Sequence, residues 1–198
     1  MSDESSGERQ LSRIEIFWIP LGAGGHGFVR WNGRVYEAIR ARAERRPRLD
    51  LYHTALEVHV PEGRFVVENA WPSPDSDTAS RGVMVEGPVF TSRLGRFRAF
   101  RYEVRCWHDG IIIDAGEAVF GPQTVMTDPA VARALLAAVA DVPGLEWGRD
   151  PLGVGDMWNS NSVISWLLVR SGIPAAELRP PEGGRAPGWR AGIVVAGR

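Results

Sequence analysis

Alternating apolar and polar positions predict a set of β-strands in the first half of the chain. The first of these runs is strongly apolar and ends at Pro20. Two later runs are separated by Pro61-Glu62-Gly63, and because Pro and Gly supply turn dihedrals, the pair is predicted to form a hairpin. The expected strands cover residues 14–21, 49–60, 64–71, 83–89 and 97–107.

Helical periodicity is more evident in the second half of the chain. Asp128 can cap a helix that has Pro129 in its first position, with Val131, Leu135 and Val139 as its apolar stripe. Helices are also expected over residues 33–46 and 162–170, and a short last strand over 193–196. This order predicts an α+β fold in which a mostly antiparallel sheet packs against helices. We expect a disordered tail over residues 1–11 and a single domain over 12–198.

Composition excludes several functional classes. The formal net charge of -1 argues against a general binder of nucleic acid or of membrane surfaces. All 23 basic residues are arginine, so no lysine can act as a base, a Schiff-base former or a phosphate clamp. Cys106 is the only cysteine, which excludes an internal disulfide. The N-terminus has no apolar leader and no apolar run approaches about 20 residues, so we expect a cytoplasmic protein without a membrane span.

Two patterns bear on cofactors and metals. Residues 22–27 match G-x-G-x-x-G after a strand, but a dinucleotide site needs a helix that begins at the last glycine. Asn32-Gly33 is a turn pair that we expect to stop such a helix, which favours a loop near a cleft instead. His53 and His59 lie six residues apart on one expected strand, up to about 20 Å, which is too far for two ligands of one metal. The sequence therefore predicts neither a cofactor nor a metal.

Four small polar residues, Asn159 to Ser162, directly precede an apolar helix. The positive end of a helix dipole favours negative charge that develops at this point. Ser and Asn are also preferred helix N-caps, so a purely structural role accounts for the run equally well. Both interpretations stay open for this run alone.

Other residues change the picture when they are added to this run. A histidine on a strand, an acid on the adjoining strand and a hydroxyl at the start of a later helix are the parts of a nucleophile–base–orienter system. His53, Glu68 and Ser160 occur in this order. The expected hairpin pairing places Glu68 opposite Glu57, an unfavourable like-charge pair unless one carboxyl is protonated, turns away or has a partner.

These motifs resemble those of the circularly permuted papain-like superfamily, which includes NlpC-type peptidases and amidases and relatives of lecithin retinol acyltransferase. Residues 53–58, HTALEV, are similar to the family strand in which His is followed by apolar alternation. Residues 67–70, VENA, resemble the family's V-x-E-A strand. Residues 159–162, NSNS, resemble its N-C-N-S/H motif before an apolar helix that ends in a small residue and Gly. The resemblance covers residues 49–173, and this chain has serine where the family has cysteine.

The resemblance implies a role for each matching residue. Ser160 would be the nucleophile, His53 the general base and Glu68 the orienter of the imidazole. The amide of Ser160 would contribute to an oxyanion hole, supported by Asn159 and Asn161. Two tryptophans near the motifs either line the cleft or pack in the core, Trp71 and Trp158.

Two hypotheses follow from this assignment. In the first, the protein is a serine-dependent amidase, esterase or acyltransferase that forms an acyl-enzyme on Ser160. A serine hydroxyl is a much weaker acid than a thiol, so it must lose its proton to His53 during attack. In the second, the scaffold is catalytically inactive and binds a peptide, acyl or cell-wall-like ligand in the same cleft. Neither hypothesis involves a nucleic acid or a membrane span, and the oligomeric state stays open.

Overall fold

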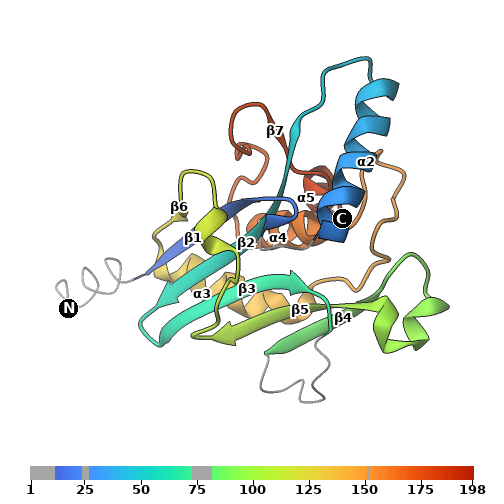
Figure 1. The fold of residues 1–198 in the computed structure, drawn as a ribbon. Coiled ribbons are helices and arrows are strands. Elements are labelled where there is room, and N and C mark those ends of the chain that lie inside the picture. The colour runs from blue at the N-terminus through green and yellow to red at the C-terminus, as the bar shows by residue number, and fades with distance from the viewer. Residues whose placement is uncertain (1–11, 24–26, 73–81, 151) are drawn as a thin grey trace.

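A seven-stranded, mainly antiparallel sheet organises the protein (Figure 1). The computed structural model describes residues 12–23, 27–72, 82–150 and 152–198. Six strands follow the spatial order β4-β5-β3-β2-β1-β6, and β7 pairs in parallel with the start of β2. The strands are β1 (Arg13–Pro20), β2 (Asp50–Val60), β3 (Gly63–Ala70), β4 (Val83–Pro88), β5 (Arg101–His108), β6 (Gln123–Met126) and β7 (Gly184–Arg185).

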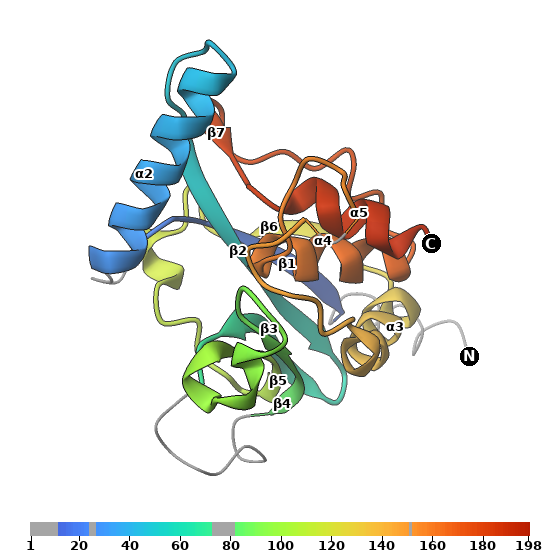
Figure 2. The same ribbon diagram turned by 90° about the vertical axis from the view of Figure 1, so that its right-hand side faces the viewer.

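Three helices cover one face of this sheet (Figures 1 and 2). They are α3 (Pro129–Ala138), α4 (Ser160–Arg170) and α5 (Trp189–Ala196). A fourth helix, α2 (Gly27–Ala43), stands beside the end of the sheet where β2 begins. In the part of the chain that the structure describes, no helix is long and apolar enough to cross a membrane. The sheet and the helices on its face confirm the predicted α+β class with a mostly antiparallel sheet.

The two faces of the sheet differ in how they are covered. Alternate residues of a strand point to opposite faces, so Ile16 and Leu56 enter the large core beneath α3, α4 and α5, together with helix residues such as Leu167. Ile19 and Ala55 point the other way, into a smaller apolar cluster that the loop after β5 covers. The face opposite the helices consequently retains several charged side chains.

The helix starting at Pro129 forms as the sequence predicts. The Asp128 side chain accepts hydrogen bonds from the amides of Ala130 and Val131, at 2.7 and 3.4 Å. Leu135 and Val139 are fully buried, which confirms the apolar stripe. A cap and a periodic stripe are local signals, and both act here without help from distant residues.

Helix α2 corrects the expectation for residues 22–33. The helix begins at Gly27 and continues through Asn32-Gly33, where the sequence predicts a stop. A glycine in a helix costs only about 1 kcal/mol relative to alanine, and the other positions of a 17-residue helix outweigh that cost. The strands on either side, β1 and β2, are antiparallel neighbours. They do not form the parallel βαβ unit of a dinucleotide site, and residues 24–26 lie outside the described part of the chain, as does the predicted tail over 1–11.

Two further elements differ from the prediction. Residues 193–196 are helical and belong to α5, because a short apolar run has no periodicity that separates a strand from a buried helix. The strand expected over 97–107 begins only at Arg101, after two single 3₁₀ turns, η3 (Leu94–Arg96) and η4 (Arg98–Phe100).

Candidate functional site

Asn159 caps helix α4 through a reciprocal pair of hydrogen bonds. Its side-chain oxygen accepts from the backbone amides of Asn161 and Ser162, at 2.9 and 3.4 Å. Its own backbone amide donates to the Ser162 hydroxyl at 3.0 Å. This is the capping box, here with serine in the third helical position. The Asn159 side-chain amide also donates to the Pro187 carbonyl at 2.9 Å. The cap therefore also holds the segment that leads into α5.

The next polar side chains fasten α4 to its surroundings. The side-chain amide of Asn161 donates to the carbonyls of Tyr52 and Pro187, at 2.9 and 2.8 Å. Its side-chain oxygen accepts from the Thr54 hydroxyl at 3.0 Å. The Ser162 hydroxyl bonds to the Gly188 carbonyl at 2.8 Å. All of these groups lie in the interior, where an unpaired polar atom costs about 1–3 kcal/mol. The polar run thus joins β2, α4 and α5, and two of the first amides of the helix are already bonded to Asn159.

Ser160 is the one member of the run without such a role. It is the first residue of α4 and is largely buried. Its hydroxyl forms no hydrogen bond with any residue that the structure describes. The position at the positive end of the helix is the one that the sequence predicts for a nucleophile.

His53 lies on the face of β2 that points away from α4. Its neighbour Thr54 bonds to Asn161 on the helix side, so strand alternation directs the imidazole to the opposite face. There, the His53 Nε2 atom lies 3.0 Å from an oxygen of Asp114, in the loop after β5. Within the described part of the chain, no hydrogen bond joins His53 to Ser160. The sequence places these two groups in one site, whereas the structure gives His53 a different partner.

Asp114 is the residue that sequence reasoning missed. It lies 61 positions from His53, next to the single turn η5 (Ala115–Glu117), in a segment without a motif. Ile112 anchors this segment in the smaller apolar cluster, and Ala55 on β2 belongs to the same cluster. No local pattern announces the contact, because the fold of the loop over the sheet creates it.

Glu68 lies on the same face as His53, but its strand neighbour differs from the predicted one. The turn pairs Val60 with Gly63, so Glu57 is opposite Val66, and Glu68 is paired with Arg105 on β5. The expected Glu57–Glu68 pair is therefore wrong: the turn is centred on Pro61-Glu62, one residue earlier than predicted, which moves the partner of Glu57 by two residues. A guanidinium nitrogen of Arg105 lies 3.8 Å from the Glu68 carboxylate.

The Glu68 carboxyl has an unusual electrostatic environment. Burial raises its pKa above the ordinary value; the positive charge of Arg105 opposes this shift, Asp114 adds to it, and His53 opposes it. The acid is thus within electrostatic reach of His53, although Asp114 forms the direct hydrogen bond. His53, Asp114 and Glu68 form a cluster on the face opposite the helices, here called the His53 cluster.

The two tryptophans occupy different environments. Trp158 is fully buried, and its ring nitrogen donates to the Tyr102 hydroxyl at 3.1 Å. That hydroxyl in turn donates to the Leu145 carbonyl at 2.8 Å. Trp158 is thus a core residue. Trp71 is half exposed and packs against Trp147, with 5.9 Å between the ring centroids.

A cavity of about 660 Å³ lies between the end of β1, the start of β2 and helix α2. Its lining combines apolar side chains with charged groups of both signs. Neither Ser160 nor His53 lines it, although the adjacent Tyr52 does. The lining includes Leu21, Arg34, Arg48, Asp50, Leu51, Tyr52, Glu117 and Val119.

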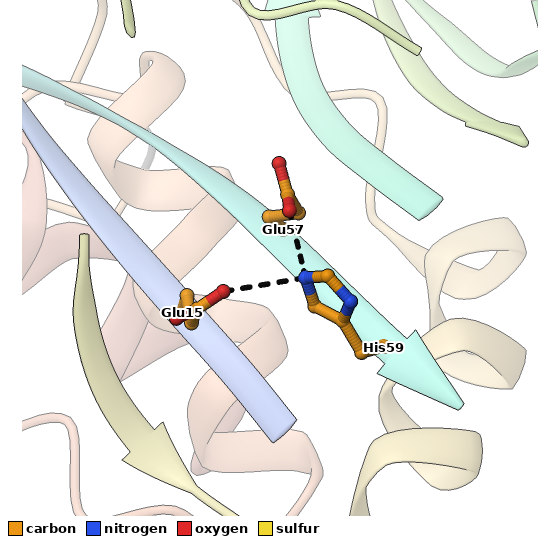
Figure 3. Close-up of side chains that lie close together, drawn as sticks. All are labelled: Glu15, Glu57 and His59. Carbon is orange, nitrogen blue, oxygen red and sulfur yellow. Dashed lines mark hydrogen bonds and ion pairs between the residues drawn. The ribbon is translucent and has the colours of Figure 1, made fainter. Parts of the chain in front are cut away.

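One cluster brings together residue types that can bind a metal (Figure 3). Glu15, Glu57 and His59 converge, with potential ligand atoms within 4.8 Å of one another. His59 Nε2 lies 2.7 Å from Glu57 and 3.2 Å from Glu15. However, Arg13 pairs with Glu15 and Arg64 with Glu57, both at 3.0 Å. Since each carboxylate already has a guanidinium partner, the cluster is charge-balanced and has the character of an ion-pair network.

Comparisons with known proteins yield no relative: no family model, no curated protein and no solved structure matches the chain.

Proposed function

We propose that this protein is a ligand-binding member of the permuted papain-like proteins in which the nucleophile–base pair is not assembled. The order of parts supports the kinship: a strand with His53, an adjoining strand with Glu68, and a later helix that begins at Ser160 and packs on the sheet. The observation that carries the proposal is the orientation of His53. Its imidazole is bonded to Asp114 on the face opposite α4.

The chemistry of serine explains why this orientation matters. A serine hydroxyl becomes a useful nucleophile only when a base within hydrogen-bond reach removes its proton. In a working triad, one imidazole nitrogen faces the hydroxyl and the other bonds to the acid. Here the Nε2 atom of His53 is bonded to Asp114, and α4 lies across the sheet. Without its base, Ser160 remains a neutral alcohol.

We place the ligand in the cavity beside α2. Its volume of about 660 Å³ lies within the usual range for ligand sites, about 300–1,000 Å³. Arg34 and Arg48 line it, and neither has an ion-pair partner among the described residues. Asp50 and Glu117 add negative charge, and Leu51 is one of several apolar contacts. Charges of both signs beside an apolar surface suit a short peptide, which carries the same mixture.

An activity-based probe tests the loss of catalysis. A fluorophosphonate should leave the folded wild-type protein unlabelled, at the same level as Ser160→Ala. Ser92→Ala, at an exposed serine outside α4, is the matched control. Labelling of the wild type that disappears in Ser160→Ala and falls sharply in His53→Ala would overturn the proposal.

Peptide binding is tested separately. On an array of short peptides of varied sequence, the wild-type protein should retain a subset, and Arg48→Ala should bind that subset at least tenfold more weakly. Arg42→Ala, at an exposed arginine of α2 that does not line the cavity, should bind as the wild type does. An array with no retained peptides, or equal losses in both variants, would contradict the cavity as the binding site.

A serine hydrolase or acyltransferase is the second candidate, favoured by the free hydroxyl of Ser160 at the positive end of α4. Catalysis would require His53 to leave Asp114 and reach the other side of the sheet. Replacement of Ser160 by cysteine separates geometry from chemistry, because a helix N-terminus activates a thiol without a base. A thiol-reactive probe that labels Ser160→Cys rapidly at neutral pH would show an accessible nucleophile position.

A further inference from the structure

A basic and aromatic segment, residues 90–101, projects between β4 and β5, remote from α2 (Figures 1 and 2). Its sequence, FTSRLGRFRAFR, contains four arginines, three phenylalanines and no acidic residue. The phenylalanine side chains are exposed to an unusual degree, 57% for Phe90, 62% for Phe97 and 40% for Phe100. Arg93, Arg96 and Arg98 are exposed as well. A single exposed ring is normal on a protein surface, but three on one short segment form an apolar patch of the kind that marks an interaction site.

The backbone holds the first of these rings outward. Phe90 has a left-handed conformation, φ 64°, which strains a residue with a side chain. Two contacts maintain it: the Phe90 amide donates to the Trp147 carbonyl at 3.0 Å, and its carbonyl accepts from Arg149 at 3.0 Å. Arg149 is exposed and adds a fifth arginine to the same surface. The exposure of Phe90 is therefore built into the fold.

We propose that residues 90–101 bind the surface of an anionic lipid membrane. Exposed aromatic rings beside arginines match the interface of a bilayer, where rings enter the headgroup region and guanidinium groups pair with lipid phosphates. The net charge of the whole chain, -1, does not oppose this binding, because screening restricts the attraction to charges near the surface. Of the nearby acids, Glu86 pairs with Arg101 at 3.1 Å, and Glu146 accepts from the Ser92 amide but keeps its charge. The five arginines of this surface still outnumber Glu86, Glu146 and Asp150, so it keeps an excess of positive charge.

Lipid fits the segment better than nucleic acid does. Proteins that bind single-stranded nucleic acid stack successive bases on aromatic side chains along a basic groove. Here Phe90, Phe97 and Phe100 lie on turns at the periphery. The cavity of about 660 Å³ lies beside α2 and not along these rings. Exposed rings at the tips of turns can enter a soft interface without a groove.

Vesicle co-sedimentation at an ionic strength of about 0.1 M, where the Debye length is about 10 Å, tests the proposal. The wild-type protein should bind vesicles of phosphatidylserine mixed with phosphatidylcholine and should not bind phosphatidylcholine alone. Each arginine near the surface contributes about fivefold to the partition coefficient, so Arg93→Gln with Arg96→Gln should lower binding about 25-fold. Phe97→Ser, which removes an exposed ring, should lower it about tenfold.

Matched controls separate the segment from general charge and hydrophobicity. Arg42→Gln removes an exposed arginine of α2, and Phe120→Ser removes a phenylalanine that is 91% exposed on another loop. Both should bind the anionic vesicles as the wild type does. Binding that is absent, or that falls equally in control and segment variants, overturns the proposal. So does tighter binding to a single-stranded oligonucleotide than to vesicles, when the same segment variants abolish it.

Discussion

Replacement of Asn159 by alanine should destabilise the protein far more than the loss of an ordinary helix cap. The side chain accepts from two amides at the start of α4 and donates to the Pro187 carbonyl. An exposed cap contributes about 1 kcal/mol, because water replaces it when it is lost. Asn159 and Asn161 are buried, so water cannot easily take over, and the unpaired amides add a penalty of about 1–2 kcal/mol.

The lost bond to Pro187 adds about 1 kcal/mol to this estimate. The total for Asn159→Ala is therefore about 3 kcal/mol. Asp128→Ala provides the matched control, because Asp128 caps α3 through the same kind of bond at an exposed position and should cost about 1 kcal/mol. Asn159→Ser keeps a capping oxygen and loses the amide, so its expected cost is also about 1 kcal/mol.

Urea unfolding followed by tryptophan fluorescence measures these differences. The free energy of unfolding should fall in the order wild type, then Asp128→Ala and Asn159→Ser together, then Asn159→Ala. Equal losses for Asp128→Ala and Asn159→Ala would refute the reasoning, because burial of the cap and its bond to Pro187 would then contribute nothing. The polar run would in that case need another explanation, and its catalytic interpretation would gain support.

Three further predictions concern α5, Glu68 and the only cysteine. Gly192→Ala should lower the free energy of unfolding by several kcal/mol, because its Cβ would overlap the Ser162 carbonyl, whereas Gly197→Ala at the end of α5 should have little effect in the same urea assay. Glu68 has a raised pKa in the folded state, so its stabilising contribution is complete below its unfolded pKa of about 4.3 and is lost as pH rises through the folded pKa. Glu68→Gln should therefore weaken the decline in melting temperature with rising pH, and an unchanged pH profile would contradict the burial of this carboxyl. Burial raises the pKa of Cys106 to about 11, so iodoacetamide at pH 8 should modify this thiol only after unfolding, and rapid modification of the native protein would refute its packing.

Signals within a few residues of one another predicted much of this fold. The Asp128 cap and the hairpin around Glu62 both depend on neighbouring residues, and both form. Helix α2 shows the limit of such signals, since the chain continues through Asn32-Gly33 when a long helix outweighs one unfavourable pair. Residues 193–196 show another limit. This short apolar run fits a helix or a strand, and its packing against α4, which lies far away in the sequence, selects the helix.

The site was harder to predict than the fold for a physical reason. The sequence shows the order of His53, Glu68 and Ser160 along the chain. It does not show the face to which a strand residue points, because that depends on register and on what covers each face. Thr54, one position along from His53, contacts the start of α4, and this single step in the alternation directs the imidazole toward Asp114. A shift of one residue would have placed the histidine beneath the helix.

The polar run at the start of α4 fits two interpretations because small polar side chains meet structural needs there as well as catalytic ones. A cap, a bond to the neighbouring strand and a bond to the following segment each require a small amide or hydroxyl side chain at the start of α4. Asn159, Asn161 and Ser162 meet these needs whether or not a reaction takes place. The Ser160 hydroxyl has no hydrogen-bond partner among the residues that the structure describes, so chemistry at this helix depends on whether a base reaches that hydroxyl. Because the imidazole is held on the other face, these residues serve to attach α5 to the start of α4, and the proposal of a binding function rests on that orientation of His53.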